Sequence, residues 1–180
     1  MPPMNTASLV LTLTFYIGTT LTNFATEQGT LDPHLEPLRP WLGKTWKSAG
    51  EGGEKPKIDV ARWERALNGK AVRILHSIND GEYGGETIAT WDEKKESVVY
   101  HYFTTAGFST TGTMGFKDGR MTTNETVSGN AGGVTEVRGT AEIAPDGTFR
   151  MKTEYLKQGK WQQARDVVYR QDATANVVFR

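Results

Sequence analysis

The chain of 180 residues has the length of a single domain, and its 21 basic and 21 acidic residues leave a formal net charge of zero. Because it has neither a basic excess nor a Lys/Arg cluster, the sequence does not favour nucleic acid as a partner. It contains no cysteine, which excludes disulfides, thiol nucleophiles and cysteine-based metal sites.

The N-terminal segment has the features of an export signal. The first 38 residues contain neither Lys nor Arg, and residues 9–21 form a Thr-rich apolar run. This run is too short for a membrane-spanning helix, which needs roughly 20 residues, but it matches the apolar region of a signal peptide. We therefore expect residues 1–25 to be a signal peptide and the mature protein to be periplasmic or secreted, with no membrane span.

The segment that follows, residues 31–43, combines three prolines with regularly spaced leucines. Leu35, Leu38 and Leu42 recur at intervals of three and four residues. The prolines prevent a long helix. The segment therefore predicts one short helical turn, or 3₁₀ turn, with an apolar face and an end at Gly43.

From Thr45 onward, tight-turn signals alternate with runs rich in β-branched and aromatic residues. The clearest two-residue turn signals are Asn68-Gly69, Asp80-Gly81, Asp118-Gly119 and Asp146-Gly147. They predict strands near 45–50, 57–67, 71–79, 85–92, 97–105, 108–117, 120–128, 134–143, 148–157 and 161–171. The segment 57–67 also fits a helix, because Val60, Trp63 and Leu67 have helical spacing and Asp59 is a suitable N-cap.

Several of these segments alternate apolar and polar residues with a period of two. In residues 71–78, for example, Val72, Ile74, His76 and Ile78 share one face. About ten half-buried strands with almost no helix predict an all-β domain over residues 31–180. We expect a single closed antiparallel β-barrel, since closure removes exposed strand edges, and a barrel of this size can enclose one small ligand.

Short stretches of the sequence resemble a known family. Residues 38–46, Leu-Arg-Pro-Trp-Leu-Gly-Lys-Thr-Trp, are similar to the opening of lipocalin-like (calycin) barrels, in which a helical turn leads to a Gly and then a Trp on the first strand. Residues 63–69, 84–87 and 91–92 resemble bacterial lipocalin-like barrels of unassigned function.

This resemblance implies that 57–67 is a strand, that Trp46 plugs one barrel end and that Arg170 on the last strand stacks over Trp46. The start of the chain is also distantly similar to nitrobindin-like haem barrels, whose iron ligand is a His on a late strand. No His follows His101 in this chain. We therefore expect no cofactor.

Two histidines are candidate acid–base groups. His76 lies among the apolar positions of 71–78, and His101 alternates with Val99 and Phe103, so both are candidates for the barrel interior. Separately buried core histidines are the alternative interpretation. A three-histidine metal site would also need His34, and no ligand spacing in the sequence is diagnostic, so no metal is expected.

Further candidates for the cavity wall are aromatic or acidic. Trp63, Phe103 and Tyr155 combine large apolar rings with strand positions. An inward-facing Glu86 would be a candidate ligand-binding group or general base, and Arg73 is a candidate partner that would offset the cost of burying its charge. Tyr100 and Tyr102 share a face opposite His101, so these three side chains cannot all line one cavity without a bulge.

The sequence lacks the nucleophile elbow, phosphate loop, dinucleotide fingerprint and zinc-protease motif of common enzymes. The leading hypothesis is a protein that binds a small hydrophobic or amphipathic molecule inside the barrel. The alternative is a cofactor-free isomerase, cyclase or lyase with cavity His and Glu/Tyr side chains as acid–base groups. An interaction module that uses an outer sheet surface, and a homodimer, are also left open.

Overall fold

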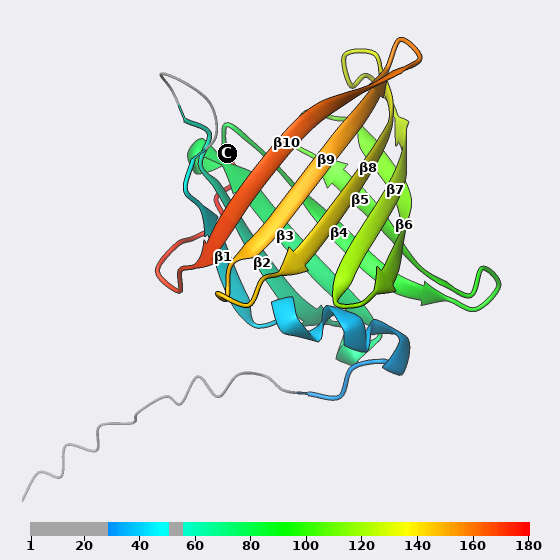
Figure 1. Cartoon of the computed structure of the whole chain (residues 1–180), viewed down its shortest axis with the longest axis vertical. Coiled ribbons are helices and arrows are strands. Elements are labelled where there is room, and N and C mark those ends of the chain that lie inside the picture. The colour runs from blue at the N-terminus through cyan, green and yellow to red at the C-terminus, as the bar shows by residue number, and fades with distance from the viewer. Residues whose placement is uncertain (1–28, 51–55) are drawn as a thin grey trace, which may run out of the picture.

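A computed structural model describes residues 29–50 and 56–180 as ten antiparallel strands that follow one another around a barrel (Figure 1). The signal peptide expected at residues 1–25 lies outside the described residues. The strands are β1 (Lys44–Ser48), β2 (Asp59–Ala66), β3 (Ala71–Ile78), β4 (Tyr83–Asp92), β5 (Ser97–Thr104), β6 (Ser109–Lys117), β7 (Arg120–Ser128), β8 (Val134–Ile143), β9 (Phe149–Lys157) and β10 (Lys160–Gln171). Short 3₁₀ turns are η1 (Pro33–Trp41), η2 (Leu67–Gly69) and η3 (Asn79–Gly81).

Each strand pairs with its neighbours in sequence, and β1 pairs with β10 to close the barrel. In the closing seam Trp46 lies opposite Gln171, and Ser48 lies opposite Tyr169. The prediction of a single closed antiparallel barrel with a short N-terminal helical turn is therefore confirmed. Closure leaves no sheet edge in the described part of the chain, which removes the main aggregation hazard of a long meander.

Most of the turn signals in the sequence adopt the positive φ angles that tight turns require. Asp118 and Gly119, between β6 and β7, have φ angles of 50° and 76°, the left-handed region that a type I′ turn needs at both central positions. The ambiguous segment 57–67 is a strand rather than a helix, because β1 and β3 hydrogen-bond to its two edges. The helical spacing of Val60, Trp63 and Leu67 is coincidental, since the Leu67 side chain is 70% exposed.

The 3₁₀ segment η1 closes one end of the barrel. The side chains of Leu35, Leu38 and Trp41 are buried there, and Asp32 caps the segment by accepting a hydrogen bond from the backbone N–H of His34. Figure 1 shows this segment in blue across the lower end of the strands. Two prolines inside the segment, Pro37 and Pro40, explain why it stays a 3₁₀ segment and does not extend as an α-helix.

Trp46 is buried beneath this segment, and Arg170 does not stack over it as the resemblance implies. Trp46 is 1% exposed, and its indole N–H donates to the carbonyl of Trp41 at 3.4 Å. Arg170 is exposed on the outer face of β10. The cation that lies over the Trp46 ring is Lys44, whose Nζ is 5.6 Å from the ring centroid. Alternation along β10 turns Arg170 outward while Tyr169 faces inward.

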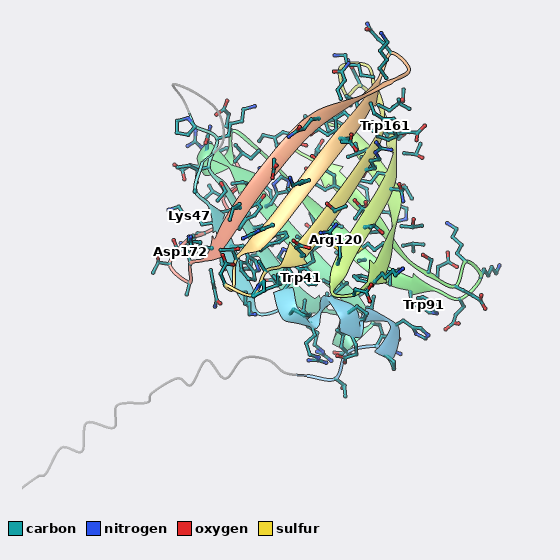
Figure 2. All side chains as sticks on the ribbon, viewed as in Figure 1. Trp41, Lys47, Trp91, Arg120, Trp161 and Asp172 are labelled. Atoms are coloured by element: carbon teal, nitrogen blue, oxygen red, sulfur yellow. The ribbon has the colours of Figure 1, made fainter. Side chains whose placement is uncertain are left out.

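The opposite end of the barrel carries the loops between β1 and β2, β3 and β4, β5 and β6, β7 and β8, and β9 and β10. In Figure 2, Trp41 marks the plugged end and Trp161, at the start of β10, marks the opposite end. The C-terminal segment after β10 returns to the outer face of β3, where the backbone N–H of Val178 donates to Ser77 Oγ at 3.0 Å. None of the helices in residues 29–50 and 56–180 has the length and apolar character needed to cross a membrane.

Candidate functional site

The barrel encloses a cavity of about 850 Å³. Its wall near η1 is apolar: Trp63, Met114, Met121, Phe149 and Met151 line it, and they continue the core that contains the η1 side chains. Toward the other end, polar side chains line the wall, and Lys57, Phe108, Ala131 and Val134 lie around the loops. This volume is in the range of small-molecule sites, and the arrangement of one apolar and one polar region suits an amphipathic ligand.

A buried carboxylate, Asp59 at the start of β2, organises the polar region. Its side chain accepts three hydrogen bonds: from His76 Nδ1 at 3.1 Å, Arg165 at 2.7 Å and the Tyr169 hydroxyl at 3.0 Å. Burial alone would raise the pKa of Asp59, but the hydrogen bond and charge of His76, together with the Arg165 guanidinium, lower it below its ordinary value. Asp59 is therefore ionised at neutral pH, and its charge is balanced by Arg165.

From Asp59 a chain of hydrogen bonds continues along the cavity wall through His76 to two tyrosines. His76 Nε2 lies 2.7 Å from the Tyr102 hydroxyl, which lies 2.9 Å from the Tyr83 hydroxyl. Burial raises the pKa of both phenols, so they remain neutral at physiological pH. The four side chains come from β2, β3, β5 and β4, and the pairing of these four consecutive strands brings them into one line.

Glycines on adjacent strands make room for the tyrosine rings. A Cβ atom at Gly85 would lie 2.3 Å from Tyr102 Cε2, and one at Gly112 would lie 2.8 Å from the Tyr100 hydroxyl. The rings of Tyr102 and Tyr100 therefore lie flat over bare backbone of β4 and β6. The Gly-Gly-Glu-Thr stretch at 84–87 has a direct structural role, since it fixes where the Tyr102 hydroxyl meets His76.

A second carboxylate, Glu125 on β7, faces the cavity from another part of the wall. It accepts a short hydrogen bond from the Thr110 hydroxyl. Burial raises the pKa of Glu125, and only Thr110 and Tyr100 counteract this effect; no cation of the described residues forms an ion pair with it. Unlike Asp59, Glu125 is therefore a cavity carboxylate without a positive partner in the described part of the chain.

Of the residues expected to bind a ligand, the structure brings three to the cavity and leaves three outside. His76, Trp63 and Tyr155 line the cavity. His101 and Phe103 are exposed on the outer face of β5, so the expected inward orientation of His101 is wrong. Glu86 also lies outside, where it pairs with Arg73 at 2.8 Å.

The three-histidine arrangement does not form. The His34 ring stacks on Trp91 at 3.9 Å between centroids, at the plugged end, while His76 lies in the polar region and His101 lies outside. Within residues 29–50 and 56–180, no group of three or more His, Cys, Asp or Glu side chains is placed to hold a metal ion.

Sequence reasoning missed the residues that organise the polar region. The sequence pattern indicates Asp59 only as a possible helix N-cap and does not single out Arg165. A β-bulge between Gln163 and Arg165 interrupts the alternation of β10, which hid the inward orientation of Arg165. Asp59 could have been found from its place in β2, because it shares a face with Ala61 and Trp63.

Comparisons with known proteins do not assign this site. No model of a known protein family matches the chain, and no curated protein matches it significantly. The functional conclusion therefore depends on the geometry of the cavity.

Proposed function

We propose that the barrel binds one small amphipathic molecule in its interior cavity. The observation that carries this proposal is the cavity of about 850 Å³, which is apolar beside the plug and polar around Asp59 and His76. The apolar body of the ligand would lie against the methionines and Trp63, and its polar end would meet the tyrosine hydroxyls. Burying about 250 Å² of apolar ligand surface would contribute roughly 6 kcal/mol before the entropic costs of binding.

The proposed setting is outside the cytoplasm. The apolar run at residues 9–21, with no Lys or Arg before Arg39, supports export, and the similarity of residues 38–46 to lipocalin-like barrels supports a carrier role. Cell fractionation of the tagged full chain tests this part: recovery with periplasmic or medium markers is expected, and recovery with cytoplasmic markers alone refutes it.

The cavity proposal is tested with the full chain and the neutral fluorescent dye Nile red, after native mass spectrometry for co-purified ligands. Val127→Trp would place a large ring in the cavity wall, and Thr126→Trp would place the same ring on the exposed outer face of the same strand. We expect Val127→Trp to weaken dye binding at least tenfold and Thr126→Trp to leave it unchanged. Absence of both co-purified ligand and dye binding in the unmodified protein would refute the proposal, as would equal binding by the two variants.

A second candidate function is acid–base catalysis on the bound molecule, and the chain from Asp59 to Tyr83 favours it. His76 Nε2 can take the phenolic proton of Tyr102 while Asp59 holds its Nδ1–H, so a proton can pass between a bound molecule and His76. The test is deuterium exchange at the α-carbon of 2-decanone in D₂O. A rate that exceeds buffer, falls at least a hundredfold in His76→Ala and is unchanged in His101→Ala supports catalysis; a rate equal to buffer refutes it.

A further inference from the structure

Lys57, Arg165, Asp59 and Glu125 are the Lys, Arg, Asp and Glu side chains of the described residues that line the cavity, but only Asp59 and Arg165 are in contact as an ion pair. Asp59 and Arg165 form an ion pair at 2.7 Å and are neutral as a unit. Lys57 is exposed among the residues that follow the β1–β2 loop. Glu125 remains, accepting a hydrogen bond from Thr110 without a cationic partner in residues 29–50 and 56–180. A carboxylate enclosed in this way is costly unless it is protonated or meets a positive group.

The hydrogen bonds that run from Asp59 through His76 and Tyr102 to Tyr83 also leave acceptor atoms unused. Because ionised Asp59 can only accept, the Nδ1–H of His76 donates to it, which leaves Nε2 as the ring nitrogen that faces the Tyr102 hydroxyl and can accept from it. Tyr102 in turn accepts from the Tyr83 hydroxyl, so the chain ends on the lone pairs of Tyr83. With His76 Nε2 accepting from Tyr102, this end of the cavity offers a hydrogen-bond acceptor to a ligand and has no spare donor along these hydrogen bonds.

Aromatic rings surround the same region. Burial raises the pKa of the Tyr100 hydroxyl, and the Glu125 charge raises it further; Glu125 acts in the same sense, more weakly, on Tyr83 and Tyr102. Tyr100 and Glu125 lie on the two strands that flank Gly112, each directly opposite it, and the Tyr83 and Tyr102 hydroxyls, 2.9 Å apart, line the same cavity. Carboxylate oxygens together with phenol faces are the groups that attract a protonated amine.

We propose that the ligand carries a protonated amine, and that its ammonium group binds Glu125 among the rings of Tyr83, Tyr100 and Tyr102. This inference rests on the proposed function and names its ligand class: an amphipathic amine whose apolar part extends toward Met114, Met121 and Met151. An anionic head group is disfavoured, because it would approach Glu125 and because the charge of Arg165 is already matched by Asp59.

The test compares three probes that share a ten-carbon chain: decylamine, 1-decanol and decanoate. Their affinities for the full chain are measured at pH 7.5 by calorimetry, below the concentrations at which the probes aggregate. We expect decylamine to bind at least tenfold more tightly than 1-decanol, and decanoate to bind more weakly than 1-decanol. Glu125→Gln should weaken decylamine binding at least tenfold and change 1-decanol binding less than threefold.

Glu136→Gln is the matched control, because it removes the same charge from the exposed outer face of β8. It should leave all three affinities unchanged. If the probes bind the unmodified protein with equal affinity, if decanoate binds most tightly, or if Glu125→Gln weakens 1-decanol as much as decylamine, the ammonium assignment is overturned while cavity binding stands. If none of the probes binds, and Nile red does not bind either, the proposed function fails and the ammonium assignment fails with it.

Discussion

Replacing Asp59 with Asn tests whether the ion pair inside the barrel stabilises the fold. The Asp59 side chain is almost fully buried and accepts from His76, Arg165 and Tyr169. An amide has one acceptor oxygen, carries no charge and places an N–H₂ group against donors. Breaking a buried ion pair by removing one partner costs about 3–5 kcal/mol, because the remaining charge is left uncompensated. For a domain of this size we expect the melting temperature to fall by about 6–20 °C.

The pH dependence gives the prediction a second, independent check. Asp59 has an ordinary pKa of 3.8, which the fold lowers. Its contribution to the free energy of unfolding is therefore complete well above pH 4 and is lost as the pH falls through the lowered pKa. Urea unfolding of the two proteins should show the full difference at pH 7 and a smaller one at pH 3, below the ordinary pKa of 3.8, because a protonated carboxyl resembles Asn and the contribution falls as the pH approaches the lowered pKa.

Two further variants separate the ion pair from other effects of the substitution. Arg165→Met in the Asp59→Asn background should recover at least half of the lost stability, because the uncompensated guanidinium is removed. Asp118→Asn is the surface control, since Asp118 is exposed in a tight turn with a φ of 50° that Asn also adopts readily. A loss below about 1 kcal/mol for Asp59→Asn at pH 7, or a loss of equal size at pH 7 and pH 3, would refute the reasoning.

Two other predictions concern the cavity wall. Glu125 has a pKa raised above its ordinary 4.5, so its contribution to stability is present below that pH and is lost as the pH rises through the raised value. Glu125→Gln should therefore stabilise the ligand-free protein by about 1–3 kcal/mol at pH 8 and leave its unfolding unchanged at pH 4; equal stabilisation at both pH values would contradict the raised pKa. Gly85→Ala should destabilise by about 1–3 kcal/mol and displace the Tyr102 hydroxyl from His76, which changed ¹⁵N chemical shifts of the His76 ring in NMR spectra would report; Gly115→Ala, next to a movable Thr122 side chain, should cost less.

The fold could be predicted from the sequence, because each turn and each strand is indicated by residues within it. Asn-Gly and Asp-Gly pairs specify tight turns, and period-two runs specify strands with one buried face. The prolines of residues 33–40 limit the N-terminal segment to a 3₁₀ turn. Only the segment 57–67 was ambiguous, and pairing with strands on both sides decided it, which is information that lies outside the segment.

The site could be predicted only in part, because its key pairings are not local. Asp59 and Arg165 are 106 residues apart in the sequence, and a bulge removed the alternation that would have shown Arg165 facing inward. Alternation showed that His101 opposes Tyr100 and Tyr102 but did not say which face points inward. Burying two tyrosine rings over glycines removes more apolar surface from water than burying His101 and Phe103, so the tyrosines take the inner face.

The two cavity carboxylates differ in a way that separates structure from function. Asp59 is paired, accepts from three donors and joins strands across the closing seam, which is what a structural carboxylate requires. Glu125 accepts from the Thr110 hydroxyl, has no cationic partner among the described residues and has a raised pKa, so in the ligand-free barrel its charge opposes folding. An apolar side chain or Gln at this position would fill the wall at lower cost. A buried carboxylate without a cationic partner is an expected feature of a binding site, because a ligand that completes the charge pair recovers on binding the stability that the free protein lacks.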